Sequence, residues 1–169
     1  LSNTIQKISH KKLRKGDARS AFNKSRKVSE NNSEKEIAMS EQLGDYSNNA
    51  TTELVRLYQR WADGGLGLSI TGNVMIDRRA LGEPCNVVVE NEEDLAKLSE
   101  WAKAGKSKGG HIIMQINHPG RQSPTFVSSQ PVAPSAVAVN VGRGMFAIPK
   151  ALTEEEILNL IKRFANTAR

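Results

Sequence analysis

The sequence has few of the features that mark secreted, metal-binding and membrane proteins. Its 169 residues contain one cysteine, Cys85, which excludes an internal disulfide and a cysteine-rich metal cluster. No apolar run is long enough to cross a bilayer, and the first residues lack the apolar core of a secretion signal. With 38% hydrophobic and 25% charged residues, the composition is that of a globular protein. We therefore expect a cytoplasmic protein with no membrane partner and no bound metal.

Acidic residues are scarce at the start of the chain. Residues 1–36 hold ten lysines and arginines against four acids, whereas residues 37–169 hold fourteen of each, so the net charge of +6 comes from residues 1–36. This segment has few large apolar residues and no sustained period, which predicts a basic, largely disordered tail. Basic arms can bind nucleic acid through phosphates, but no aromatic platform or recognition motif accompanies these lysines. A solvated or divergent extension is favoured over a polyanion-binding arm, and a transit peptide is a further alternative.

Three later segments repeat apolar residues at the spacing of a helix face. These segments are residues 51–63, 91–105 and 153–169. Gly64 and Gly65 are predicted to end the first helix, and Asn91 to cap the second. Thr153 and Glu156 have the spacing of a capping box at the start of the third. We expect the third helix to bury Ile157, Leu160, Ile161, Phe164, Ala165 and Ala168.

Strand patterns alternate with these helices. Residues 66–76 and 111–116 are apolar runs typical of buried strands, and 36–40 is a weaker candidate. The connection 119–150 contains five of the six prolines, and within it residues 136–148 alternate about a Gly-Arg-Gly turn, which predicts a hairpin. Strand, helix, strand, helix, strand, helix indicates an α/β fold with parallel pairing, either an open doubly wound sheet or a barrel. A dinucleotide-binding G-x-G-x-x-G turn after the first strand is absent.

The carboxyl ends of the predicted strands carry amides and hydroxyls. Gln115 lies on the strand 111–116, and Thr71, Gly72 and Asn73 lie on the preceding strand. Parallel strands gather their functional groups at this edge in both architectures. An amide both donates and accepts, which suits a flat heterocycle with alternating N–H and C=O groups. These residues favour binding of a cofactor that supplies its own chemistry. For His118 and Arg121, a scaffold role is favoured over catalysis.

Four stretches resemble the amino-terminal part of the Old Yellow Enzyme family of FMN-dependent NADH:flavin oxidoreductases. They are "YQRWADGGLGLSITGNVMIDRR", "MQINHPGRQ", "PVAPSA" and "PKALTEEEILNLIKRFANTAR". The resemblance covers residues 37–169 and implies a partial TIM (β/α)8 barrel of about the first three βα units, with FMN at its carboxyl-terminal mouth. It further implies that Gln115 binds the pyrimidine edge of the flavin, that Met39 and Ser40 line the ring, and that Asn73 lies beside a flavin carbonyl.

The resemblance also implies a reaction. NAD(P)H would reduce FMN, and the hydride would pass to an activated alkene such as a small enone. No catalytic residue is expected here, because the family's paired donors to the substrate oxygen follow a fourth strand that this chain does not reach. The chain is therefore expected to be a fragment, inactive alone, and able to form a homo-oligomer. The alternative is a non-catalytic truncated barrel with a polyanion-binding tail.

Overall fold

The computed structural model describes residues 5–6, 40–141 and 144–169. Its central sheet has the order β1-β3-β2, with strands β1 (Ile5–Gln6), β2 (Leu68–Met75) and β3 (His111–Asn117). β2 and β3 are parallel, as the sequence predicts, whereas β1 runs antiparallel to β3. The rest of the predicted tail, and residues 36–39 of the weak strand, lie outside the described residues. None of the helices in the described part of the chain has the length and apolar character that a bilayer crossing requires.

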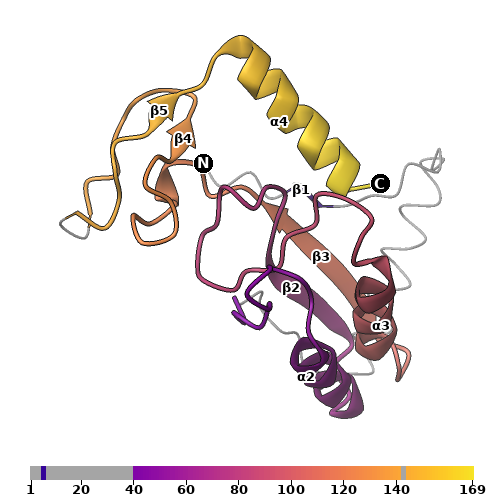
Figure 1. The fold of residues 1–169 in the computed structure, drawn as a ribbon. Coiled ribbons are helices and arrows are strands. Elements are labelled where there is room, and N and C mark those ends of the chain that lie inside the picture. Colours follow the sequence, from indigo (N-terminus) through magenta and orange to yellow (C-terminus); the bar gives the residue numbers. More distant parts are fainter. Residues whose placement is uncertain (1–4, 7–39, 142–143) are drawn as a thin grey trace.

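Helices α2 (Thr52–Asp63) and α3 (Leu95–Gly105) pack together beside the sheet (Figure 1). Their core contains Tyr58 and Trp101, which meet edge to face with ring centroids 5.2 Å apart. Apolar burial of this kind is the main term that stabilises a small α/β domain. The sequence correctly predicts the α2 stripe, whose buried members are Leu54, Tyr58 and Ala62, with Leu57 and Trp61 packed against the same core.

Hydrogen bonds from the flanking residues explain where both helices begin and end. Thr51 caps α2 by accepting a hydrogen bond from the Leu54 N–H, and Gly64 ends it as predicted. The predicted cap of α3 is wrong, because this helix begins four residues after Asn91. The Asn91 Oδ1 instead accepts from the Glu93 N–H at 3.0 Å, which closes a local turn. The Asp94 carboxylate accepts from the Ala50 N–H at 2.8 Å and so joins the start of α3 to that of α2.

The connection after β3 contains no hairpin in its described residues. The alternating residues 136–141 and 144–148 hold no strand, so this prediction is wrong. Two short parallel strands form instead, β4 (Val132–Ala133) and β5 (Lys150–Ala151). Prolines restrict the backbone on either side and remove donors, which favours short pairing over a regular hairpin. A single turn of 3-10 helix, η1 (Gly120–Gln122), follows β3 directly.

Helix α4 (Glu154–Thr167) begins with the predicted capping box. The Glu156 N–H donates to the Thr153 hydroxyl at 3.2 Å, and the Thr153 N–H donates to the Glu156 carboxylate at 2.9 Å. The predicted burial of its apolar face is wrong, however, because Ile157 and Ile161 are 37% and 58% exposed. The yellow helix in Figure 1 lies beyond the edge of the sheet, away from the core that α2 and α3 share.

We expect Thr153→Ala to lower the free energy of unfolding by about 0.5–2 kcal/mol, because the first turn of α4 loses the acceptor for one N–H group. Urea titration followed by circular dichroism at 222 nm measures this. Thr52→Ala, an exposed threonine within the first turn of α2, is the matched control and should change the value by less than about 0.5 kcal/mol. Equal effects of the two substitutions would contradict the capping role.

Candidate functional site

The parallel pairing of β2 and β3 is irregular where the predicted site residues lie. Ile70 pairs with Ile113 and Asn73 with Gln115, so β2 has one more residue than β3 between these pairs. The extra residue is a β-bulge, which turns the strand locally and leaves a backbone group unpaired. It lies at Thr71 and Gly72, directly before Asn73.

Side chains satisfy the backbone groups that the bulge displaces. The Thr71 hydroxyl accepts from the Gln115 N–H at 2.9 Å and donates to the Gly72 carbonyl at 2.8 Å. The Gly72 N–H donates to the Glu41 carboxylate at 3.1 Å. A polar group buried without a partner is costly, so these bonds stabilise an irregularity that the backbone ladder alone does not support.

Asn73 and Gln115 lie side by side because the extra residue of the bulge shifts the register so that they pair. The Gln115 Nε2 donates to the Asn73 Oδ1. Val74 and Met114 pack into the helix-side core, and side chains alternate along a strand, which places Asn73 and Gln115 on the opposite face. Apart from this bond, no hydrogen bond of the Asn73 or Gln115 side-chain amides is found among the described residues. This face therefore presents both donors and an acceptor near the carboxyl ends of two strands.

Ser40 lies near Asn73, one member of this pair. The Asn86 Nδ2 donates to the Ser40 Oγ at 3.3 Å, and Ser40 and Asn73 line the same small cavity. The structure thus brings together three of the four residues that the sequence predicts, Ser40, Asn73 and Gln115. The fourth, Met39, lies outside the described residues.

Sequence reasoning missed Glu41. Its carboxylate accepts hydrogen bonds from the Tyr58 hydroxyl on α2 and from the Gly72 N–H of the bulge. The only signal in the sequence is an acid directly after Ser40. Because a bulge cannot be predicted from the apolar pattern of β2, the partner of this acid could not be named.

The residues that follow β3 have a structural part in this arrangement. The His118 Nδ1 accepts from the Gly120 N–H at 3.1 Å, and the Arg121 Nη1 donates to the Val137 carbonyl at 3.3 Å. Burial lowers the pKa of His118, and the cations of Arg163 and Arg79 lower it further against the opposing effect of Asp77. The lowered pKa favours the neutral imidazole, which fits its role as an acceptor.

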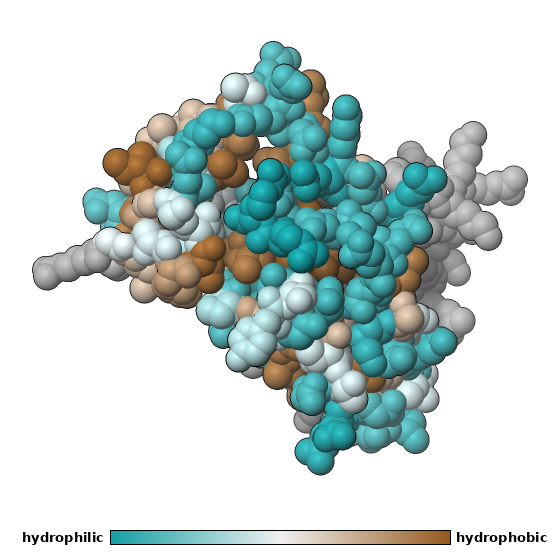
Figure 2. Space-filling model, in the orientation of Figure 1, coloured by the Kyte–Doolittle hydropathy of each residue, from teal (hydrophilic) through white to brown (hydrophobic). Residues whose placement is uncertain are grey.

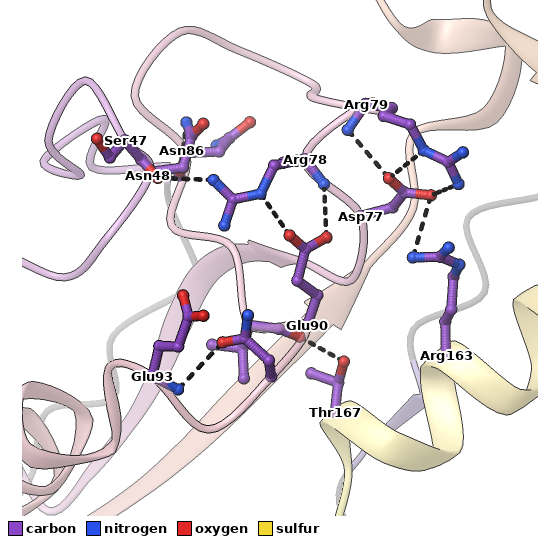
Figure 3. A network of polar contacts seen from close by, with 12 residues as sticks. Ser47, Asn48, Asp77, Arg78, Arg79, Asn86, Glu90, Glu93, Arg163 and Thr167 are labelled. Carbon is purple, nitrogen blue, oxygen red and sulfur yellow. Dashed lines mark hydrogen bonds and ion pairs between the residues drawn. The ribbon is translucent and has the colours of Figure 1, made fainter.

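A wider cleft, of about 530 Å³, lies between α4 and the segments that follow β2 and β3. Its charged centre is Asp77, which accepts from the guanidinium of Arg79 at 2.7 and 2.9 Å and faces Arg163 of α4 at 3.6 Å (Figure 3). Burial alone raises the pKa of Asp77, but the hydrogen bonds from Arg79 and the charges of both arginines outweigh it, so this pKa is lower than usual. Neither Asn73 nor Gln115 lines this cleft, and its charges already pair with one another.

Comparison with known proteins identifies the family. The model of the NADH:flavin oxidoreductase / NADH oxidase family matches residues 37–169. The chain belongs to this family. It is 33% identical over 150 residues to the NADH-dependent flavin oxidoreductase iliE of Hypocrea jecorina (strain QM6a), an alignment that covers 78% of this chain and 37% of that protein.

Solved structures of similar proteins agree with the fold. An Old Yellow Enzyme homologue from Zymomonas mobilis superposes with a TM-score of 0.67 at 25% identity, over 77% of this chain and 38% of that one. Morphinone reductase in complex with tetrahydroNAD gives a TM-score of 0.63 at 25% identity, over 78% and 39%. The chain thus has the α/β fold of part of an Old Yellow Enzyme TIM barrel and spans less than half the length of these relatives.

Proposed function

We propose that residues 37–169 form the amino-terminal part, about three βα units, of a TIM-barrel enzyme that binds FMN, and that residues 1–36 are a basic tail from which Ile5–Gln6 add β1 to the central sheet. The observation that carries this proposal is the Asn73–Gln115 pair beside Ser40. It lies near the carboxyl ends of parallel strands, where barrels of this type hold their ligands. The family match to residues 37–169 supports the same boundaries.

The polar groups of this face fit a flavin. A pyrimidine edge presents an N–H between two carbonyls, and Gln115 and Asn73 retain an acceptor and donors for such an edge. In this proposal Gln115 and Asn73 hold the ring edge, and Met39 and Ser40 line the ring. When bound, FMN would supply hydride transfer from NAD(P)H to the β-carbon of an activated alkene such as an enone. The chain's own residues bind and orient, and none of them is assigned a catalytic proton transfer.

Several features support the wider proposal. The name of the Hypocrea jecorina relative specifies NADH, and the morphinone reductase complex contains a nicotinamide analogue, so NAD(P)H is the proposed reductant. A small enone-like molecule is the proposed substrate, and the cytoplasm is the proposed location.

We also propose a homo-oligomer, since apolar side chains are exposed around β4 and β5 (Figure 2). They belong to Phe126, Val137, Val141, Met145 and Ile148.

Titration of FMN with the chain tests this function through quenching of flavin fluorescence. The chain should bind FMN, and Gln115→Ala should weaken binding by about 10- to 100-fold, because a buried amide hydrogen bond is worth about 1–3 kcal/mol once its partner is left unpaired. Gln122→Ala, an exposed glutamine of η1, is the matched control and should bind as the unaltered chain does. No binding by the unaltered chain, or equal binding by both variants, would contradict the proposal.

A further inference from the structure

Glu41 joins three parts of the molecule that are distant in sequence. Its carboxylate accepts from the Tyr58 hydroxyl of α2 and, at 3.1 Å, from the N–H of Gly72. Tyr58 is 1% exposed and has edge-to-face contacts with Trp61 and Trp101, so its hydroxyl is held by the core. A rigid helix, a loop and the bulge of β2 therefore meet at one carboxylate.

The bulge is the part of this junction that matters for the candidate site. β2 lies at the edge of the described sheet, so alternate N–H groups of this strand face away from β3. The N–H of Gly72, within the bulge, donates to the Glu41 carboxylate. Asn73 follows Gly72 directly, and its position opposite Gln115 depends on the length of the bulge. Without the bulge, the alternation of side chains would turn Asn73 toward the helices.

We propose that Glu41 is a positioning residue, whose carboxylate fixes the β2 bulge at Gly72 and thereby holds Asn73 against Gln115 for flavin binding. The role in flavin binding rests on the proposed function. The role in the bulge does not, because it follows from contacts within the chain. Glu41, Ser40 and Asn73 line the same void of about 10 Å³, so the Glu41 side chain is a close neighbour of Asn73.

A charged acceptor at position 41 makes stronger hydrogen bonds than a neutral one would. Hydrogen bonds to a carboxylate are roughly twice as strong as those between neutral groups. Glutamine at position 41 would keep the shape and one acceptor oxygen, whereas leucine would remove the acceptor of the Gly72 N–H. The series Glu, Gln, Leu should therefore loosen the bulge in steps.

Amide hydrogen exchange of the Gly72 N–H, measured by NMR, tests whether Glu41 fixes the bulge. In Glu41→Leu, protection of the Gly72 N–H should fall about 10- to 100-fold, the effect of losing a hydrogen bond to a charged group, and in Glu41→Gln it should fall about threefold. The side-chain amide signals of Asn73 and Gln115 should shift in the same order. The reference is the Met75 N–H on the same strand, which donates to the Val87 carbonyl and should keep its protection. Glu53→Leu, an exposed acid in the first turn of α2, is the matched control.

The outcomes separate this role from a general loss of stability. Equal loss of protection at Gly72 and Met75 would overturn the proposal, as would unchanged protection at Gly72. If Glu41→Leu does not fold, the comparison of Glu41→Gln with the unaltered chain decides the same question. FMN titration supplies the second readout, with binding expected to weaken about tenfold in Glu41→Leu and less in Glu41→Gln. A chain that does not bind FMN at all would refute the proposed function, while the exchange experiment would still decide the role of Glu41 in the bulge.

Discussion

Replacement of Trp101 by alanine is expected to lower the free energy of unfolding by about 3–5 kcal/mol, the range for removing a large aromatic side chain from a core. Trp101 is 2% exposed and meets Tyr58 edge to face at a centroid distance of 5.2 Å and an interplanar angle of 76°. The indole joins α3 to α2, and its truncation leaves a cavity that both helices line. Such aromatic pairs add about 0.5–1.5 kcal/mol to the energy of area burial.

Urea denaturation at neutral pH, followed by circular dichroism, measures this loss. Leu95→Ala is the matched control, because Leu95 lies on the same helix but is 53% exposed, and its replacement should cost less than about 0.5 kcal/mol. Trp101→Phe should retain much of the stability, since the Nε1 of Trp101 has no hydrogen-bond partner among the described residues and packing is its main contribution. A Trp101→Ala midpoint close to that of Leu95→Ala would show that the two helices do not depend on this contact.

Removal of the Asp77 carboxylate is expected to lower the free energy of unfolding by about 1–3 kcal/mol at neutral pH. This value lies between those measured for exposed and for buried ion pairs. The side chain of Asp77 is buried, with 5% exposed, whereas its partners Arg79 and Arg163 are 73% and 31% exposed. Asp77→Ala would leave two arginines without their shared anion and would release α4 from the end of β2. The matched control is Glu100→Ala, which breaks the exposed pair with Lys97 and should change stability by at most about 0.5 kcal/mol.

The pH dependence of stability tests the same substitution, Asp77→Ala. The pKa of Asp77 is lower in the folded chain than its ordinary value of 3.8, so the carboxylate stabilises the fold at pH values above 3.8. This contribution is lost as the pH falls through the folded-state pKa. The difference in stability between the unaltered chain and Asp77→Ala should therefore be full at neutral pH and should close in acid below pH 3.8. A difference that stays constant across this range would mean that packing, and not charge, is what the substitution removes.

Much of the central fold is predictable from the sequence because its signals are local. The stripe of α2, the capping box of α4 and the two apolar runs that become β2 and β3 each depend on neighbouring residues. The family match confirms the family that the motifs indicate, and the structural neighbours confirm the α/β barrel type. The roles of Met39, Ser40, Asn73 and Gln115 toward FMN stay predictions, although three of these four lie together.

The errors arise where distant residues decide the structure. Asp94 accepts a hydrogen bond from the Ala50 N–H, 44 positions away, and α3 begins directly after Asp94, later than the Asn91 signal suggests. Residues 136–148 alternate as a hairpin does, yet Lys150 pairs with Val132 instead, because β4 and β5 are selected by long-range contacts. Glu41 shows the same limit, since its hydrogen bond with the Gly72 N–H spans 31 positions and joins it to a bulge that no local pattern encodes.

The exposed apolar residues of α4 have a consequence for local unfolding of the chain. This helix is joined to the rest by a few polar contacts, among them Arg163 with Asp77 and the Thr167 hydroxyl with the Val89 carbonyl, while α2 and α3 share an aromatic core. Segments with few buried apolar contacts open at low free energy without global unfolding. Within residues 40–141 and 144–169, a protease should therefore cleave around Lys162 before it cleaves in the core that contains Trp101.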